Sequence, residues 1–502
     1  MQKPICQANP GPSWSRLLIW GICFLPQLTG AQNSVDPAYQ PANTLAETLP
    51  ETLSKINTRL EADLAALPKP NKKFLAKEYK ERADSLKSEL LQGSFLMDDR
   101  WNPWFQNILE EILRHNPDVA ARDITLLLSR YESPNARCVG EGTLVFNIGL
   151  LPFLENESQV AFILCHELAH YHNNHGNQAL HQYINTLYSP EMQKQLKEIS
   201  RGTYNKTERA LELMKGMAYN GRRHSRFKES EADSLGFVFF SRTGYQLKEA
   251  VGALQILDSI DKSHWPRIPY DSLFQSKGFP FQNSWLEQKG LGGGFSTQAT
   301  QPSSSTEFNE DSLKTHPDCP ERIKLTQAQV EALGKDTGKA FLQDETQFHT
   351  MQQKTPYELV EGLYQTGHYG RSLFRALVML TKKRDDAYLN AMVVKNLYEI
   401  CQYQRNHRMR HVVDLPDPEY SAEYNRFLKF INQFRTSEFQ QLTYHFYLER
   451  WEKYKHTEDF MFAAVLATSL KPENPDFQSR LDEYLTTYPK GKYLDHIKAM
   501  KD

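Results

Sequence analysis

Hydrophobic positions follow a helical period over most of this chain. Leucines recur at helical spacing among charged residues over 45–67 and 74–91, which predicts amphipathic helices. Two short apolar runs, 124–128 and 143–147, break that period and predict buried strands. From residue 356 the helical pattern returns and continues to the end of the chain. The expected fold class is therefore mainly α with a small β-sheet (α+β).

The C-terminal stretch, residues 356–502, combines small residues such as Ala376 and Ala463 with many aromatic residues. Turns between its predicted helices carry Gly, Pro or Asp. This pattern weakly resembles helical hairpins of the tetratricopeptide type, although a strict repeat of about 34 residues cannot be fixed. An irregular all-α bundle explains the same pattern equally well.

The N-terminal residues differ from the rest in charge and hydropathy. Lys3 and Arg16 are the only charged residues before Asp36, and the apolar run Leu17–Leu25 follows them. A small-residue stretch then ends at Ala31, which predicts a secretory signal peptide cleaved after that residue. A membrane anchor is the alternative, but the run is well short of the ~20 residues that span a bilayer. We therefore expect an exported chain, periplasmic before secreted or membrane-associated, with no transmembrane span once it is mature.

The net charge bears on nucleic-acid binding, and the cysteine content bears on disulfides. The chain has 59 Lys and Arg against 61 Asp and Glu, for a formal net charge of −2, so no global field attracts nucleic acid. We expect no nucleic-acid partner. An exported protein can form disulfides, but the sequence does not choose among the pairings of Cys138, Cys165, Cys319 and Cys401.

One motif carries recognisable chemistry. His166, Glu167 and His170 form the pattern H-E-x-x-H inside an apolar stretch. Positions i and i+4 share one face of a helix, so the two imidazoles can bind one metal ion, while Glu167 can polarise a metal-bound water. This is the core of a zinc hydrolase. A surface helix with two coincidental histidines is the alternative, so a further ligand is needed to decide.

A second helical stretch offers that ligand. Glu229, Ala232, Asp233 and Gly236 follow the spacing i, i+3, i+4, i+7 and so share one helix face. The two small residues allow this face to approach the motif helix closely. We expect Glu229 to bind the metal and Asp233 to accept a hydrogen bond from a ligand histidine, whereas Glu231 should point to solvent. The alternative is a solvated acidic face.

Four blocks of sequence, in order along the chain, resemble one family. They are 142–151 with the preceding Asn135, 157–176, 225–233, and the Thr-His-Pro of 315–317 with Arg322. Together they resemble peptidase family M48, the HtpX- and BepA-like zinc metallopeptidases, which also include the CAAX prenyl proteases and the Oma-type proteases. The resemblance covers less than half of the chain.

The resemblance implies a zincin-like domain in which one zinc ion is bound by His166, His170 and Glu229. It implies that Glu167 is the catalytic base. It also implies that His316 lies near the metal, where it either stabilises the oxyanion or occupies the open coordination position in a resting state.

Two further residues gain roles from the resemblance. Arg322 would support the site or the substrate, and His175 would be structural. Many relatives are integral membrane proteins, whereas this sequence shows no stretch long enough to span a membrane. The chain therefore resembles the exported members that join the catalytic domain to helical repeats. The segment 137–141 is more polar than in the family, which bears on the substrate cleft.

These arguments divide the chain into sections. We expect a signal peptide at 1–31, an N-terminal helical segment at 32–95, a zinc metallopeptidase domain at 96–330, a connector at 331–355 and a tetratricopeptide-like helical domain at 356–502. Residues 262–308 read as one long loop, and its Gly- and Ser-rich part, 289–308, is either a lid or disordered.

The predicted function is an exported zinc endopeptidase for protein quality control, which hydrolyses peptide bonds in unfolded or misassembled envelope proteins. If the second strand lies at a sheet edge, it could pair with an extended substrate. The residues of that strand are Thr143, Leu144, Val145, Phe146 and Asn147. The alternative is a chaperone-like scaffold whose C-terminal helices bind an envelope assembly complex, with proteolysis latent.

Overall fold

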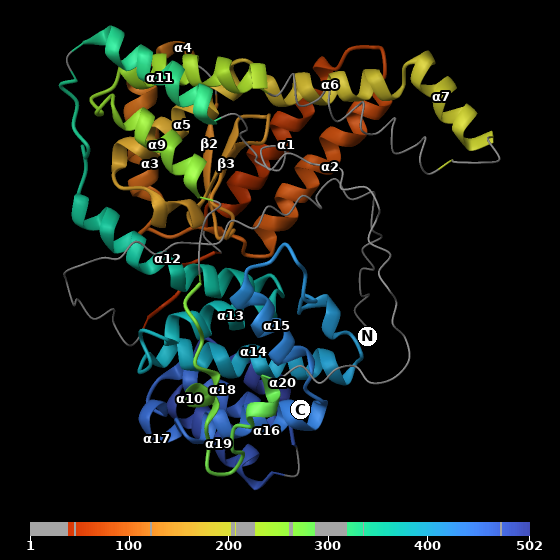
Figure 1. Ribbon diagram of the computed structural model, residues 1–502, viewed down its shortest axis with the longest axis vertical. Coiled ribbons are helices and arrows are strands. Elements are labelled where there is room, and N and C mark those ends of the chain that lie inside the picture. Colours follow the sequence, from red (N-terminus) through yellow and green to blue (C-terminus); the bar gives the residue numbers. More distant parts are fainter. Residues whose placement is uncertain are drawn as a thin grey trace.

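The computed structural model describes residues 39–44, 47–120, 123–201, 206, 226–260, 265–286, 319–334, 336–471 and 474–501. Two lobes lie along the longest axis of the molecule, the upper formed mainly by the N-terminal half and the lower by the C-terminal helices (Figure 1). The mainly α fold with a small sheet is confirmed. The signal segment 1–31, the stretch 289–308 and His316 lie outside the described residues. Within the described ranges, no helix combines the length and apolarity needed to cross a membrane.

The upper lobe is a layered structure around a four-stranded sheet. Its strands are β1 (Phe95–Leu96), β2 (Thr125–Ser129), β3 (Ala136–Cys138) and β4 (Thr143–Asn147), in the order β1-β2-β4-β3. Strand β4 pairs in parallel with β2 and antiparallel with β3, while β1 pairs antiparallel with β2. The hairpin that joins β3 to β4 uses Gly140 at φ +105° and Gly142 at φ +97°, a backbone region that favours glycine.

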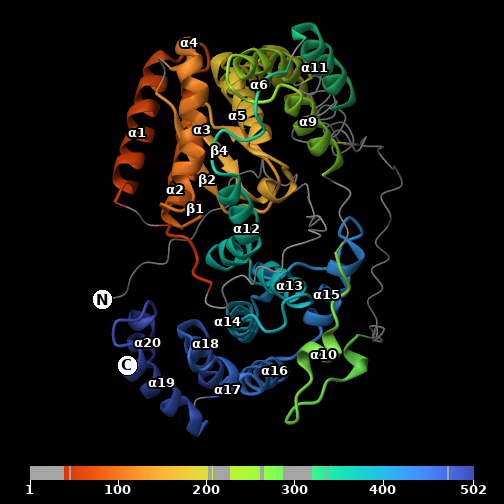
Figure 2. The ribbon, with the colours of Figure 1, turned by 90° about the vertical axis from the view of Figure 1, so that its left-hand side faces the viewer.

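Helices cover both faces of this sheet (Figure 2). On one side lie α1 (Leu49–Ala66) and α2 (Lys72–Leu91), whose buried side chains pack with Val145 of β4. On the other side lie α3 (Asn102–His115) and α5 (Glu157–His172), which pack with Leu144 and Phe146. Alternate residues of β4 thus face two apolar layers, which explains its continuous hydrophobic run.

Residues 143–147 do not lie at a sheet edge, so the condition under which this strand would pair with a substrate is not met. All five residues of β4 are buried, and the strand lies between β2 and β3. The strand at that edge of the sheet is β3, and no described strand pairs with its outer side. Strand β3 is short and contains Arg137, so it lacks the apolar run by which β4 was recognised.

Helix α5 follows a 3₁₀ turn, η1 (Ile148–Phe153), and starts at a true cap. The side chain of Asn156 accepts a hydrogen bond from the backbone N–H of Gln159 at 3.1 Å. The helix ends at His172, shortly before Asn174, which takes the left-handed conformation at φ +55°. Helices α6 (His175–Leu187) and α7 (Pro190–Arg201) follow.

Three other helices and a short one complete the upper lobe. The helix of residues 226–241 and α9 (Glu249–Ser259) pack on α5, α11 (Cys319–Leu333) packs on α9, and α4 (Pro117–Ala120) follows α3. Cys138 and Cys165 of this lobe and Cys401 of the lower lobe are free thiols.

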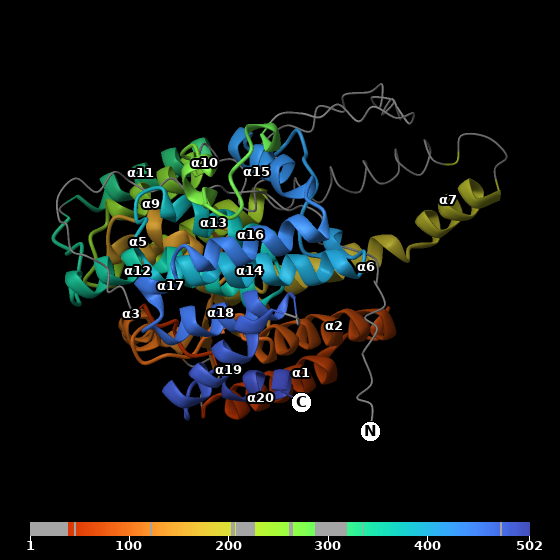
Figure 3. The same ribbon diagram turned by 90° about the horizontal axis from the view of Figure 1, so that it is seen from below.

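The lower lobe is an array of packed helices (Figure 3). They are α12 (Glu345–Gln365), α13 (Tyr369–Leu380), α14 (Ala387–Arg405), α15 (Ala422–Asn432), α16 (Thr436–Leu448), α17 (Trp451–Tyr454), α18 (Glu458–Ser469), α19 (Pro475–Thr487) and α20 (Leu494–Lys501). Helix α12 packs on α13 and α13 on α14, while α14 packs on α16 and α18. Pairwise packing of consecutive helices is typical of helical hairpins; the tetratricopeptide assignment stays a prediction.

Helix α12 belongs to both lobes. Its first half buries Phe348 and Met351 in the core of the upper lobe, and its second half buries Tyr357 and Val360 in the core of the lower lobe. The helix runs unbroken across residues 355 and 356, where the sequence suggested that a connector ends. One continuous helix through two cores restricts the movement of the lobes relative to each other.

Part of the predicted loop 262–308 is ordered on the lower lobe. Residues 265–286 contain the short helix α10 (Tyr270–Phe274) and the turn η2 (Asn283–Trp285). Their apolar side chains are buried in the core of the lower lobe, and Arg450 donates from Nη2 to the backbone oxygen of Leu273 at 2.8 Å. The turn-rich composition concealed these anchors, so the expectation of one flexible loop over this stretch is wrong.

Candidate metal centre

Two helices meet closely at the centre of the upper lobe. On the helix of residues 226–241, Glu229, Ala232, Asp233 and Gly236 are all buried, as their spacing predicted. Gly236 faces α5, and a Cβ at this position would lie 3.0 Å from the backbone N and Cα of His166. Ala232 is fully buried. Small residues thus allow the carboxylate-bearing face to approach the motif helix.

This approach gathers three donors around one point. The Nε2 atoms of His166 and His170 lie 3.0 Å apart, and each lies 3.4 Å from a carboxylate oxygen of Glu229. All three ligand atoms fall within 4.8 Å of one another. Ligands about 2.0–2.2 Å from a tetrahedral zinc ion are separated by about 3.3 Å. The donor set and its spacing therefore fit one zinc ion.

The other face of His166 is held by Asp233. His166 Nδ1 lies 2.9 Å from Asp233 Oδ1, which directs Nε2 toward the donor cluster. Burial lowers the pKa of His166, but hydrogen bonds to Asp233 and Glu229 outweigh it and raise that pKa to about 10. The strongly negative surroundings that hold a proton here are the surroundings that favour a divalent cation.

Arg322 fixes the acidic pair from α11. Its Nε donates to Asp233 Oδ2 at 2.5 Å, its Nη2 donates to Oδ1 at 2.8 Å, and its Nη1 lies 3.4 Å from Glu229 Oε2. The side chain is only 1% exposed. Burial raises the pKa of Asp233, but the hydrogen bonds from Arg322 and His166 lower it to about 2. Asp233 is thus an ionised carboxylate held in a fixed orientation.

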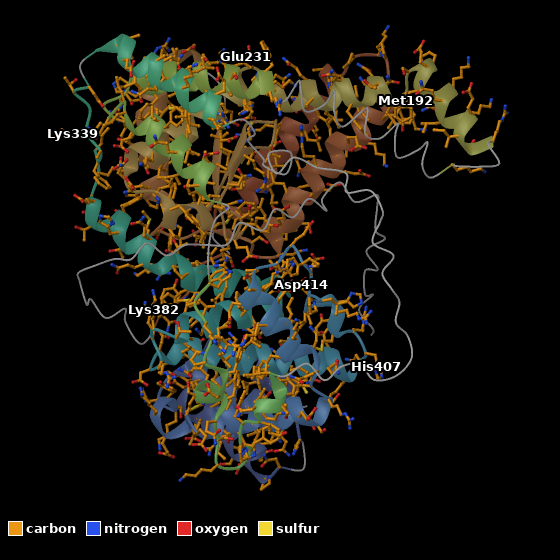
Figure 4. All side chains as sticks on the ribbon, in the orientation of Figure 1. Met192, Glu231, Lys339, Lys382, His407 and Asp414 are labelled. Atoms are coloured by element: carbon orange, nitrogen blue, oxygen red, sulfur yellow. The ribbon has the colours of Figure 1, made fainter. Side chains whose placement is uncertain are left out.

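His170 is supported by a residue whose contact the sequence did not reveal. His175 Nδ1 lies 2.9 Å from His170 Nδ1, and His175 Nε2 lies 3.1 Å from a carboxylate oxygen of Glu231. Burial and the neighbouring His170 lower the pKa of His175. Glu231, which is labelled on the upper lobe in Figure 4, therefore contacts His175 although we expected it to be only solvated. The turn at Asn174 brings His175 back to the site, and helical spacing cannot reveal such a turn.

Glu167 and the edge strand line one open pocket. The pocket has a volume of about 220 Å³ and is bounded by 135–138 of the edge strand and its lead-in, Gly140, Glu167, His170, Tyr171, Asn174 and Gly176. Glu167 itself is nearly buried, with 3% of its surface exposed. A carboxylate, a histidine of the donor cluster and a strand edge thus face the same space.

The structure brings together most of the residues that the sequence singled out. His166, Glu167, His170, Glu229, Asp233 and Arg322 form one cluster, in which all but the partly exposed His170 are buried. Residues 143–147 lie inside the sheet and do not face the pocket, while His316 is outside the described residues. Sequence reasoning did not assign 136–138 as the pocket wall, although it linked the segment 137–141 to the substrate cleft and singled out the preceding Asn135.

Comparison with known proteins identifies the lobe that contains this cluster. Residues 99–330 match the family model described as Peptidase family M48. The matched residues include the donor cluster, the edge strand β3, α5 and the helix of residues 226–241. No curated protein matches the chain.

Proposed function

By its residues 99–330 the chain belongs to peptidase family M48, and from this premise we propose that it is a zinc-dependent endopeptidase acting on unfolded or misassembled polypeptides. The observation that carries the proposal is the donor cluster of His166, His170 and Glu229, within 4.8 Å, beside a pocket that also contains Glu167. The edge strand β3 also lines that pocket.

The residues of the cluster divide the work of hydrolysis. A zinc ion, when bound by His166, His170 and Glu229, supplies a Lewis acid that activates water at neutral pH and polarises the scissile carbonyl. Glu167 accepts a proton from the attacking water and delivers it to the leaving amine nitrogen as the peptide C–N bond breaks. We propose that His316 stands nearby and either stabilises the oxyanion or occupies the open position at rest.

The edge strand β3 supplies main-chain groups that can bind an extended substrate. Arg137 of β3 pairs with Val145, and neighbouring pairs alternate in their hydrogen bonding. The backbone N–H of Val139 and the backbone oxygen of Asn135 both bond toward β4. By alternation, the main-chain groups of Ala136 and Cys138 face outward, where an extended polypeptide can add as a further strand. Main-chain pairing gives weak sequence preference, which suits unfolded chains.

Export and recruitment complete the proposal. The N-terminal pattern of residues 1–31 supports a cleaved signal peptide and a periplasmic location. The helical lower lobe is a candidate surface for an envelope assembly complex. Fractionation of cells and N-terminal sequencing of the exported chain test this part, because the proposal requires a mature protein that begins near residue 32.

The decisive experiment substitutes Glu167 in the full-length mature protein. Glu167→Gln keeps the size of the side chain but removes the base, so it should retain about one zinc per chain and lose at least about 10²-fold in cleavage of unfolded casein. Glu155→Gln, at an exposed glutamate just before α5, is the matched control and should cleave as the wild type does. If Glu167→Gln cleaves normally, Glu167 is not the base; if the variant loses cleavage but supports full biological activity, the chaperone-like scaffold replaces the enzyme.

A further inference from the structure

The loop that leads into the edge strand β3 contacts the lower lobe. Residues 130–135 connect β2 to β3, and Asn135 is already part of the pocket wall. Glu132, in the middle of this loop, has a side chain only 14% exposed. Its Oε2 accepts a hydrogen bond from Arg375 Nε at 2.7 Å, and Arg371 Nη1 lies 3.7 Å from its Oε1. Both arginines belong to α13.

The two arginines are themselves fixed within the lower lobe. Arg371 Nε donates to Asp414 Oδ2 at 2.9 Å, and the Tyr424 hydroxyl donates to the same oxygen at 2.7 Å. Asp414 is labelled in Figure 4 at the level where the lobes meet. The guanidinium of Arg375 lies 5.3 Å from the ring centre of Trp265, a residue of the anchored segment 265–286. Although burial opposes its charge, Glu132 and Asp414 raise the pKa of Arg371, so it stays cationic.

The start of the loop is held by α12. Arg130 donates from Nε to Glu358 Oε2 at 2.9 Å and from Nη2 to the backbone oxygen of Ala42 at 2.6 Å. Both charged side chains are almost fully buried, with 3% and 0% exposed. Gly362, one turn further along α12, lies against Arg130 so closely that a Cβ there would come within 2.6 Å of the arginine Cβ.

The main chain of the loop has equally little freedom. A Cβ on Gly149 of η1 would lie 2.4 Å from the backbone oxygen of Glu132. Asn147 Nδ2 donates to the Ser133 oxygen at 3.1 Å, and the Asn147 backbone N–H donates to the Asn135 oxygen at 3.0 Å. From Glu132 to Asn135 the chain can span only about 10 Å when extended, so a displacement of Glu132 reaches the edge strand.

We infer that Glu132, clasped by Arg371 and Arg375, is a positioning residue through which the helical lobe sets the place of β3 opposite Glu167. This inference rests on the proposed function, because it assigns substrate binding to that strand. Loss of the contact between Glu132 and the two arginines should weaken the affinity for an extended polypeptide. It should leave the metal ligands in place, since these lie on α5 and on the helix of residues 226–241. A ligand of the lower lobe that moves α13 therefore changes substrate binding.

The test compares KM with kcat in the full-length protein. Glu132→Ala and Arg375→Ala should each raise KM for an extended decapeptide by about tenfold, with kcat within twofold and zinc content unchanged. A substrate too short to pair with β3 should show no change in KM. The exchanged pair Glu132→Arg/Arg375→Glu should recover at least half of the lost affinity on a logarithmic scale.

Arg480→Gln is the matched control, since it breaks a 2.7 Å ion pair with Glu483 within the lower lobe, far along the chain from α13. It should leave KM unchanged. An unchanged KM in Glu132→Ala, equal effects on short and long substrates, or the same KM increase in Arg480→Gln would each overturn the inference.

Amide hydrogen exchange separates this inference from the proposed function. In Glu132→Ala, exchange over 136–139 should accelerate severalfold relative to the wild type and to Arg480→Gln, whether or not any variant cleaves peptides. If the wild type cleaves nothing but this exchange difference appears, the function is wrong and the positioning role stands. Exchange that matches the wild type over this strand removes the positioning role itself.

Discussion

Gly236 lies directly against the backbone of His166, with space for no side chain between them. A Cβ at Gly236 would lie 3.0 Å from both His166 N and His166 Cα, and 3.1 Å from the Cys165 oxygen. All three are backbone atoms, so no side-chain rotation can relieve the contact. The distance between the candidate zinc ligands on the two helices therefore depends on Gly236, which has no side chain to bind a metal.

We expect Gly236→Ala to push the two helices apart and to lower both stability and zinc affinity. Overpacking of a buried contact costs about 1–3 kcal/mol, and the displacement moves Glu229 away from His166 and His170. Thermal unfolding and zinc competition against a fluorescent chelator measure the two effects. Gly176→Ala, at a position where a Cβ meets nothing within 4 Å, is the matched control. Equal zinc affinity in both variants would contradict the role of Gly236.

Asp233 is expected to control zinc affinity through His166. Asp233→Asn keeps the shape of the side chain but removes the charge that orients Nδ1 of His166 at 2.9 Å. It also removes the ionised carboxylate that accepts two hydrogen bonds from the buried Arg322. Loss of such a supporting carboxylate typically weakens metal binding about 10- to 100-fold, which chelator competition at pH 7 measures. Glu321→Gln on the same helix as Arg322 is the control and should bind zinc normally; an Asp233→Asn protein with unchanged affinity would refute the prediction.

The hydrogen bonds that Asp98 accepts from Asn43 and Arg100 predict a pH-dependent contribution to the free energy of unfolding. Asp98 accepts hydrogen bonds from the backbone N–H of Asn43 at 2.8 Å and from Arg100 Nε at 2.8 Å. Burial raises the pKa of Asp98, but the bonds from Arg100 and Asn43 outweigh it and lower that pKa to about 2. A folded-state pKa below the unfolded value of about 3.9 stabilises the fold above pH 4, and this stability is lost as the pH falls toward 2.

Asp98→Asn should therefore lower the free energy of unfolding by about 1–2 kcal/mol at pH 7. The difference between wild type and variant should shrink as the pH is lowered from about 4 to about 2. Urea unfolding at a series of pH values measures it, with Asp99→Asn as the control at the adjacent aspartate. A difference that stays constant down to pH 2 would show that the charge of Asp98 is not its source.

Local periodicity was sufficient to predict which residues of the donor cluster share a helix face. The spacing of Glu229, Asp233 and Gly236 places them on one helix face, and H-E-x-x-H does the same for the histidines. Both statements depend only on the geometry of a single helix, so tertiary contacts did not alter them. The small size of Gly236 also predicted the close contact between the helices.

The features that escaped prediction depend on contacts between distant parts of the chain. Strand order follows from long-range pairing, so the apolar pattern of β4 could not show that β3 would lie outside it. The anchoring of 265–286 on the lower lobe depends on surfaces more than 100 residues away, such as that of Arg450. The contact of Glu132 with Arg375 joins two lobes, and neither residue belongs to a motif.

The outward main-chain groups of β3 give the sharpest test of substrate binding at the sheet edge. Cys138→Pro removes one N–H that faces away from β4, so it should leave the β3–β4 pairing intact and delete one hydrogen bond to an extended substrate. A net loss of about 1 kcal/mol corresponds to an increase in KM of about fivefold. Cys138→Ala retains the N–H and is the control; burial raises the pKa of the Cys138 thiol to about 12, so this change removes no charge at neutral pH. Steady-state cleavage of an extended peptide by both variants measures KM. An increase in both variants would assign the effect to the side chain, and an increase in neither would place the substrate elsewhere than on this strand.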